Sequence, residues 1–227
     1  MKYAMISSMN EKYYNFCGKA MLDSYIKYCS HIPMYLYNEN FTPSHSVNLQ
    51  GWNLGTEYEK FQSRHKKRTA IFGKKAFSII HAMNNLNYDY LIWIDADVVF
   101  EKSLDDDILD QVSNENILSS HFSVYHEVEG KQYHSCETGF FVLNKKHKEF
   151  DNFKNTYTSI YVNDDNANLR RFYDGEVYGE VVNRLGNEYM QNLNISTKYK
   201  TPMKRSILKD HITHYKGKGN KINLSQK

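Results

Sequence analysis

The chain has 227 residues, of which 41% are hydrophobic and 24% charged, which is enough for one ordinary core in a single domain over residues 1–227. Its 29 basic and 26 acidic residues give a formal charge of +3, too balanced for a dedicated nucleic-acid-binding protein. No apolar run approaches the roughly 20 residues of a membrane span, and the first residues lack the apolar stretch of a secretory signal. Cys17, Cys29 and Cys136 form no Cys-x-x-Cys pair, so they indicate reduced thiols and a cytoplasmic location, not disulfides or a zinc knuckle.

The first half of the chain predicts strands that alternate with helices. Strands are expected at residues 3–7, 33–37 and 88–94, and helices at residues 11–28, capped by Asn10, and 68–85. The stretch 41–64 is rich in Asn, Gly, Thr and Ser, and we expect a long surface loop there. This order predicts an α/β fold with a mixed, mostly parallel sheet flanked by helices.

The second half is patterned differently. Residues 117–124 and 139–143 are strand-like and are separated by a polar stretch. Residues 145–161 and 174–185 are helix-like, and Asp174 can serve as the N-cap of the second helix. The tail, residues 216–227, is basic and has no apolar pattern.

Two aspartates separated by one small residue follow the apolar strand 88–94. In open α/β sheets, ligands bind at the carboxyl ends of the strands, so Asp95 and Asp97 stand where a site is expected. Two carboxylates this close repel each other and favour a bound cation. Hard oxygen ligands in an open site suit Mg²⁺ or Mn²⁺, which also bind phosphates. The alternative is that the two aspartates only cap the strand end or open the next turn.

The stretch from Tyr88 to Asp97 resembles the DxD strand of GT-A nucleotide-sugar glycosyltransferases, especially the glycogenin and lipopolysaccharide galactosyltransferase-like group. The resemblance implies one Rossmann-like GT-A domain that binds Mn²⁺ or Mg²⁺ through Asp95 and Asp97. It also implies sugar transfer from a nucleotide-diphospho-sugar, with a UDP-sugar as the expected donor, to an acceptor hydroxyl.

The end of the chain resembles the His-x-x-Gly-x-x-Lys element of the same family. His214 and Gly217 match this pattern, whereas Asn220 stands at the lysine position and leaves Lys218 or Lys221 to supply the missing charge. The resemblance makes His214 the third metal ligand. A glycine-rich, lysine-bearing loop would offer N–H groups and cations to the donor's diphosphate.

Three basic residues lie on the predicted helix that precedes the DxD strand. Arg68 stands where the family has a basic residue that opens this helix, which implies a contact with the diphosphate or nucleotide. Lys74 and Lys75 are expected to lie on the solvated face of the helix.

Two carboxylates are the candidates for acting at the sugar. Glu137 begins a strand that resembles the family's element beside the donor sugar, and it is a candidate for contacting sugar hydroxyls or acting as a base. Asp174 stands where retaining members carry Asp-Gln and could position the acceptor or take its proton. Because Gly175 replaces the glutamine, retention or inversion stays open.

The first predicted strand ends where GT-A proteins read the nucleotide base. Ser7 and Asn10 are candidate base contacts on this ground, and Tyr13 offers a ring that could stack on the base.

Other function classes remain. Residues 95–99 also fit the nucleophile strand of haloacid-dehalogenase-type phosphatases, with Asp95 as the nucleophile, although that strand usually opens its domain. A sugar-phosphate nucleotidyltransferase would need a glycine-rich basic loop after the first strand, which is absent. The 19 tyrosines and the basic tail leave open a non-catalytic nucleotide-sugar or nucleic-acid-binding module, or a transferase acting on modified DNA bases.

Overall fold

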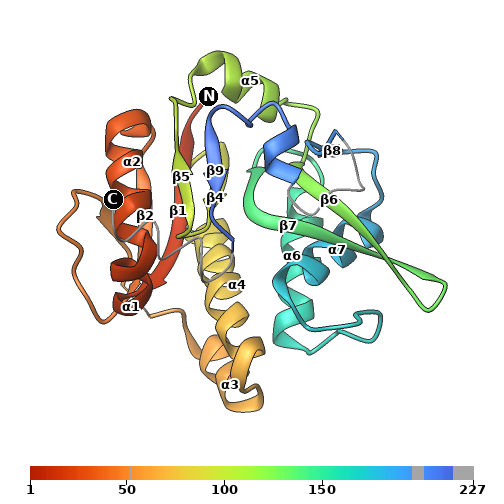
Figure 1. Ribbon diagram of the computed structural model, residues 1–227. Coiled ribbons are helices and arrows are strands. Elements are labelled where there is room, and N and C mark those ends of the chain that lie inside the picture. The colour runs from red at the N-terminus through yellow and green to blue at the C-terminus, as the bar shows by residue number, and fades with distance from the viewer. Residues whose placement is uncertain (52, 196–201, 217–227) are drawn as a thin grey trace.

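The computed structural model describes residues 1–51, 53–195 and 202–216 (Figure 1). Its helices are α1 (Glu11–Tyr13), α2 (Lys19–Cys29), α3 (Thr56–Arg64), α4 (Lys67–Asn85), α5 (Asp106–Val112), α6 (Phe150–Val162) and α7 (Asp174–Leu185), with a π-helical segment at Tyr14–Gly18 and a 3-10 turn at Pro202–Arg205. Its strands are β1 (Tyr3–Asn10), β2 (Met34–Glu39), β3 (Asn48–Leu49), β4 (Tyr90–Ile94), β5 (Val98–Phe100), β6 (Ser119–Val128), β7 (Lys131–Asn144), β8 (Met190–Asn192) and β9 (Ile212–His214).

Seven strands form one sheet in the order β3-β2-β1-β4-β7-β6-β8. The pairs β3–β2, β2–β1, β1–β4 and β6–β8 are parallel, whereas β7 runs antiparallel to both β4 and β6. The prediction of a mixed, mostly parallel sheet flanked by helices is therefore confirmed. None of the helices that the structure describes is long and apolar enough to cross a membrane.

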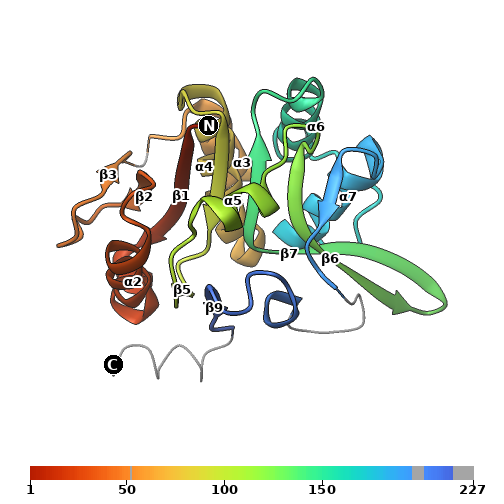
Figure 2. The same cartoon turned by 90° about the horizontal axis from the view of Figure 1, so that it is seen from above.

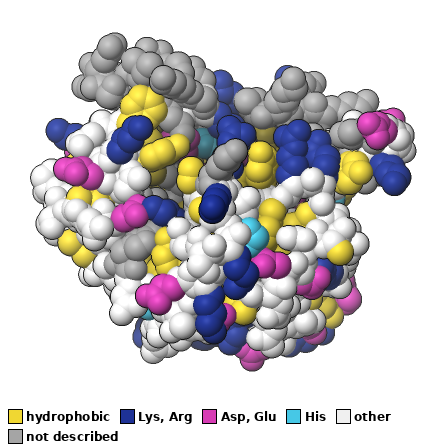
Figure 3. Space-filling model, turned by 90° about the horizontal axis from the view of Figure 1, so that it is seen from below, with side chains coloured by type: hydrophobic (Ala, Val, Ile, Leu, Met, Phe, Trp, Pro, Cys, Tyr) yellow, Lys and Arg dark blue, Asp and Glu magenta, His cyan; other side chains and the backbone are white. Residues whose placement is uncertain are grey.

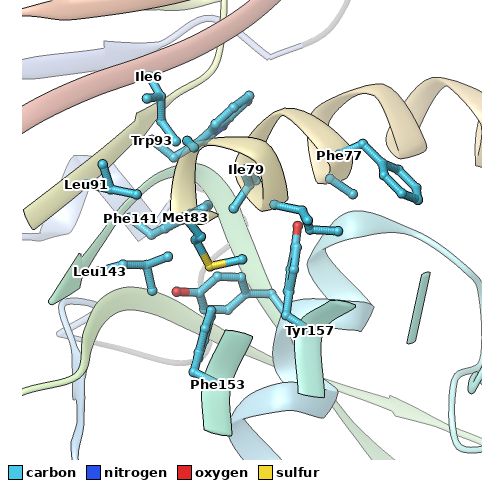
Figure 4. Packing of buried hydrophobic residues seen from close by; sticks show 14 of the residues in the cluster. Ile6, Phe77, Ile79, Met83, Leu91, Trp93, Phe141, Leu143, Phe153 and Tyr157 are labelled. Carbon is cyan, nitrogen blue, oxygen red and sulfur yellow. The ribbon is translucent and has the colours of Figure 1, made fainter. Parts of the chain in front are cut away.

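Both faces of the sheet are covered, and the central strand β4 shows why its sequence is apolar throughout. Leu91 and Trp93 point to the side of α4, α6 and α7, where they join one buried cluster (Figure 4). Ile92 and Ile94 alternate to the other side and pack with residues of α2 and α5. Figure 2 shows these layers, with α4 and α6 on one side of the sheet and α2 on the other. A strand covered on both faces needs apolar residues at every position.

A small two-stranded ribbon lies beside the main sheet, just after the DxD segment. Strand β5 pairs antiparallel with β9, which joins Val98 to His214 and Phe100 to Ile212. The pairing brings the end of the described chain back to the carboxyl end of β4 (Figure 2). The sequence analysis predicted neither of these two short strands.

The predicted loop 41–64 is wrong in its last part, because residues 56–64 form helix α3. The only buried residues of this helix are Tyr58 and Phe61, so its own sequence carries a weak helical pattern. Phe61 is fully buried and packs against Phe77 of α4, with ring centroids 5.5 Å apart. Tertiary packing of one aromatic side chain thus stabilises a helix that local patterning does not reveal.

The second half also differs in its boundaries. Strands β6 and β7 continue well beyond the predicted segments and meet in a tight two-residue turn, in which Glu129 and Gly130 both have positive φ, 52° and 74°. Such a turn matches the twist of a hairpin. Helix α6 begins at Phe150, not at 145, because Asn144 Oδ1 accepts a hydrogen bond from the Lys146 N–H and holds a turn there. Helix α7 starts at Asp174 as predicted, but its N-cap is Tyr173, so the expectation that Asp174 is the N-cap is wrong: the Asp174 carboxylate contacts Thr138 and Lys75 instead of capping the helix.

Candidate functional site

The two aspartates of the DxD segment leave β4 in a tight turn. The Asp95 N–H donates to the Gly139 carbonyl of β7 at 2.9 Å, and the Val98 N–H donates to the Asp95 carbonyl at 3.0 Å. The indole N–H of Trp93 donates to Asp95 Oδ1 at 2.7 Å. Asp97 is 6% exposed. The apolar strand and its neighbour therefore fix the Asp95 carboxylate at the carboxyl end of β4, and Asp97 is buried two residues further on.

His214 meets these aspartates from the opposite end of the chain. Strand β9 places its Nε2 atom 3.0 Å from Asp97 Oδ1. One ligand atom from each of Asp95, Asp97 and His214 lies within 4.8 Å of the others. A Cβ atom on Gly139 would lie 2.7 Å from His214 Nδ1, so the imidazole fits only because this strand position is glycine. The three predicted metal ligands come together.

Glu137 lies behind His214 and is nearly buried, at 7% exposure. Its Oε1 is 3.2 Å from His214 Nδ1 and accepts a hydrogen bond from the Gly139 N–H at 3.2 Å. Its Oε2 forms an ion pair with Lys216. Glu137 thus contacts the imidazole of His214, and it does not line the pocket described below.

Lys75 is a site residue that the sequence analysis missed, because a lysine on an amphipathic helix usually lies in solvent. It is only 8% exposed, and its Nζ lies 2.8 Å from Asp95 Oδ1 and 3.0 Å from Asp174 Oδ2. The Nζ also donates to the Thr138 carbonyl at 2.5 Å. Burial alone would lower the pKa of Lys75, but the two carboxylates outweigh it and raise this pKa. The expectation that Lys75 lies on the solvated helix face is wrong.

Asp174 begins α7 and is held between Lys75 and Thr138. The Thr138 hydroxyl donates to Asp174 Oδ2 at 2.7 Å. Burial alone would raise the pKa of this carboxyl, but Lys75 and the Thr138 hydrogen bond hold the pKa below its ordinary value. A Cβ on Gly175 would lie 2.4 Å from the Cys136 carbonyl oxygen. No side chain fits at position 175, so the glutamine of the family's Asp-Gln pair is sterically excluded.

A pocket of about 320 Å³ opens in front of these groups. Its lining includes Asp95, Asp97 and Asp174, together with Lys74 and Lys75 of α4 and residues at the end of β1 and in α1. Asn10 and Tyr13, two of the candidate base contacts, are in this lining. The Tyr13 side chain is 43% exposed, and Asn10 Oδ1 accepts a hydrogen bond from the Tyr13 N–H at 2.8 Å.

Several other predicted donor contacts do not line this pocket. Ser7 is fully buried, and its hydroxyl has no hydrogen-bond partner among the residues that the structure describes. Arg68 is exposed on α4, with its guanidinium 5.8 Å from the centre of the Tyr173 ring. Gly217, Lys218 and Lys221 lie outside the described residues.

The donor set of Asp95, Asp97 and His214 fits a divalent cation. Two carboxylates and one imidazole form an oxygen-rich ligand set that suits Mn²⁺ or Mg²⁺, and the two aspartates line a pocket in which water or a phosphate could complete the shell. His214 turns Nε2 towards Asp97 Oδ1, at 3.0 Å, and Nδ1 towards Glu137 Oε1, at 3.2 Å. Nε2 is therefore the nitrogen available to ligate, and the Glu137 carboxylate faces the other side of the ring, as is usual for a metal-bound histidine. These three residues therefore suit a metal ion.

Comparison with known proteins identifies the fold. No protein-family model matches the sequence, and a search of curated proteins finds no match. The galactosyltransferase LgtC, solved with donor and acceptor sugar analogues, aligns with 98% of this chain and 95% of its own at 9% identity, with a TM-score of 0.60. The glycosyltransferase GlyE of Streptococcus pneumoniae aligns with 85% of this chain at 15% identity, with a TM-score of 0.54. This chain has the GT-A fold.

A third GT-A structure matches at nearly full length. It is a glycosyltransferase involved in the glycosylation of the major capsid of PBCV-1, and it covers 98% of this chain and 99% of its own at 16% identity, with a TM-score of 0.53. The chain spans only 45% of GlyE. The GT-A fold expected from the DxD strand is confirmed, and the named structures are glycosyltransferases, not phosphatases.

Proposed function

We propose that this chain is a metal-dependent glycosyltransferase that moves a sugar from a nucleotide-diphospho-sugar, expected to be a UDP-sugar, to an acceptor hydroxyl. The observation that carries the proposal is the convergence of Asp95, Asp97 and His214, from β4 and β9, beside a pocket on a GT-A fold. The acceptor, a glycan or a modified DNA base, stays open, and a cytoplasmic location stays a prediction.

The metal ion, held by Asp95, Asp97 and His214, would supply Lewis-acid neutralisation of the charge that develops on the leaving nucleoside diphosphate. Tyr13 offers a partly exposed ring beside the pocket, which supports a role in stacking on the nucleotide base. The lower face of the molecule, where β1 ends, carries several Lys and Arg side chains interspersed with acidic ones (Figures 1 and 3). The pocket lining itself has the carboxylates of Glu39, Asp95, Asp97 and Asp174 against Lys74 and Lys75, so a divalent cation would be needed there to attract an anionic donor.

Asp174 is the carboxylate we assign to the reacting sugar. It lines the pocket, and its ion pair with Lys75 keeps it ionised. A general base works best when its pKa lies near the working pH. A carboxyl with a lowered pKa is better suited to stabilise positive charge on the sugar ring, or to orient the acceptor, than to remove a proton.

Glu137, the second predicted catalytic carboxylate, is assigned a different role. Its carboxylate contacts His214, Lys216 and the Gly139 N–H, and it does not line the pocket. We therefore propose Glu137 as a positioning residue that orients the imidazole of His214. Carboxylates that hold a ligating histidine in this way tune metal affinity.

The proposal is tested by measuring thermal stability with free nucleotides and nucleotide-sugars, with and without Mn²⁺. We expect one nucleoside diphosphate and its sugars to raise the Tm only when Mn²⁺ is present. A ligand at a hundred times its Kd stabilises the fold by about 2.7 kcal/mol, which for this chain length corresponds to about 5–10 °C.

Two variants sharpen the test. Asp97→Asn should lose the Mn²⁺-dependent Tm shift and the turnover while it keeps the native Tm in the absence of ligand. Asp107→Asn, on the exposed side of α5, is the control and should behave as the unaltered protein. A panel in which no nucleotide stabilises the protein with Mn²⁺ present would contradict the proposal, as would an Asp97→Asn protein with normal turnover.

A further inference from the structure

Three metal-binding side chains converge at a second place, on the strands β6 and β7. One ligand atom from each of His121, His134 and Cys136 lies within 4.8 Å of the others. His121 is 2% exposed and Cys136 is 6% exposed, and Cys136 forms no disulfide. These residues differ from the DxD cluster in their chemistry, since they offer two nitrogens and one sulfur where the DxD cluster offers mostly oxygen.

Strand geometry explains why these residues meet. His134 and Cys136 are two positions apart on β7 and so lie on one face of that strand. His121 stands where the β6–β7 register shifts, between Ser120 and Phe122, and its contact with the Ser123 hydroxyl places its ring in the same space. Ser123 and Cys136 are direct partners in the antiparallel register. Four polar or thiol side chains therefore face the same space beside α7.

Two imidazole nitrogens converge on one hydroxyl in this space. His121 Nε2 and His134 Nε2 both contact the Ser123 hydroxyl oxygen, at 3.1 and 3.0 Å. The hydroxyl can donate to one of the two nitrogens and accept from the other, so both Nε2 atoms point at the same small volume. His134 Nδ1 lies 2.8 Å from Asn183 Oδ1 and donates its proton there, whereas the buried His121 Nδ1 has no hydrogen-bond partner among the described residues.

We propose that His121, His134 and Cys136 form a second metal site for a borderline-soft divalent cation such as Zn²⁺, with Ser123 Oγ or a water in the fourth position. Two imidazoles and one thiolate favour Zn²⁺ over Mg²⁺ or Mn²⁺. A cation would accept both Nε2 lone pairs at once. His134 then keeps its Nδ1–H for Asn183, the arrangement usual for a metal-bound histidine.

Metal binding needs neutral imidazoles and a deprotonated thiol, so one proton must leave Cys136. A neutral imidazole offers one nitrogen lone pair to a cation. Cysteine ligates as the thiolate, so a thiol that is protonated in the absence of a cation must lose its proton on binding. Binding therefore forms a Zn–S bond, breaks the S–H bond and releases one proton to solvent.

The site would join the β6–β7 hairpin at a point next to the proposed active site. Glu137 and Thr138, which contact His214 and Asp174, follow Cys136 directly along β7. Asn183 of α7 holds His134 from the other side. A bound cation would thus fix the strand that carries these two residues relative to α7.

The test uses Co²⁺ as an optical probe of a zinc site. Chelator-treated Asp97→Asn protein, in which the DxD cluster is weakened, is titrated with Co²⁺. We expect one equivalent to bind with a thiolate-to-cobalt charge-transfer band in the near ultraviolet, and stoichiometric Zn²⁺ to abolish that band. The readout needs no nucleotide and no turnover, so it does not depend on whether the proposed glycosyltransferase activity is right.

Matched variants in the same background decide the assignment. Cys136→Ser should lose the charge-transfer band. Cys29→Ser, which changes a buried cysteine outside this cluster, should keep it. Asn183→Ala should bind Co²⁺ about 10–100-fold more weakly. Circular dichroism confirms that each variant is folded. Absence of the band in the folded Asp97→Asn protein, or its persistence in Cys136→Ser, would overturn the proposal.

Discussion

Lys75 is a buried cation that stabilises two carboxylates of the candidate site. It supplies the counter-charge for Asp95 and Asp174, and all three side chains are largely removed from water. Removing one partner of a buried ion pair leaves an uncompensated charge and typically costs 3–5 kcal/mol, since the lost attraction no longer offsets desolvation.

We therefore expect Lys75→Met to lower the free energy of unfolding by about 3 kcal/mol in urea titrations without nucleotide. The control is Lys74→Met, one position along α4, whose partner is the partly exposed Glu39. Loss of such a partly exposed pair costs about 1 kcal/mol or less. Equal losses in the two variants would refute the structural role assigned to Lys75.

Replacement of Glu137 should weaken the binding of Mn²⁺ at the proposed metal site. Glu137→Gln keeps the shape of the side chain but removes the charge that faces His214 and Lys216. We expect the Mn²⁺ concentration at half-maximal activity to rise about 10–100-fold, with a smaller change in kcat at saturating metal. Glu115→Gln, at an exposed position, is the control. A loss of kcat that excess Mn²⁺ does not restore would instead indicate a direct catalytic role.

Helix α7 packs on β7 through two glycines, and this contact positions Asp174. A Cβ on Gly175 would lie 2.4 Å from the Cys136 carbonyl oxygen, and one on Gly179 would lie 2.7 Å from the His134 carbonyl oxygen. The two glycines are four residues apart and so share one face of the helix. The backbone of α7 can therefore approach the strand that carries Thr138.

Replacement of these glycines tests how close the approach is. In an exposed helix, Gly→Ala stabilises by up to about 1 kcal/mol. Here Gly175→Ala should instead destabilise by about 1–3 kcal/mol, because the added methyl group meets backbone atoms that cannot move aside. It should also reduce activity by displacing Asp174. A Gly175→Ala protein with an unchanged or higher Tm would show that α7 is less tightly seated than the structure has it.

The elements that the sequence predicted well are those with a strong local signal. The apolar strand before Asp95, the amphipathic α4 and the start of α7 at Asp174 all follow from the spacing of their apolar residues. Helix α3 escaped prediction because Phe61, its one fully buried residue, is held by a partner on α4. Local patterning does not reveal which distant groups a residue will meet.

The residues of the candidate site likewise include some that the sequence predicts and some that it does not. The DxD aspartates and His214 belong to short motifs, so their residue types and spacing point to metal chemistry. Lys75 does not, because its role depends on Asp95 and Asp174, which lie 20 and 99 residues further along the chain. The chain pattern likewise gives no sign of the ribbon between β5 and β9, since strands of three residues are too short to show a period.

The molecule as a whole should lose stability as the pH falls below about 6.5, because burial lowers the pKa values of His81 and His147 in the folded state. As the pH drops, these histidines take up protons in the unfolded chain before they do so in the folded one. Their stabilising contribution is therefore present above the unfolded pKa and is lost towards the folded pKa values.

Urea unfolding at pH 7.5 and 5.5 measures this loss. His81→Gln should reduce the difference in unfolding free energy between the two pH values, by a few tenths of a kcal/mol because His81 is only partly buried. The side chain of His81 contacts the Tyr37 hydroxyl, so the variant is compared with itself at the two pH values and not only with the parent. An unaltered difference would assign the pH dependence to other groups.

The pairing of β5 with β9 makes the proposed metal cluster depend on two segments that the ribosome adds at different times. Asp97 and His214 are 117 residues apart. At about 5–20 residues per second, the ribosome adds His214 roughly 6–23 s after Asp97. During synthesis, the sheet from β1 to β7 can form while the third ligand has yet to be made. A nascent chain that ends before β9 can therefore form this sheet and still lack His214, so that the proposed metal binding would report that translation has passed β9.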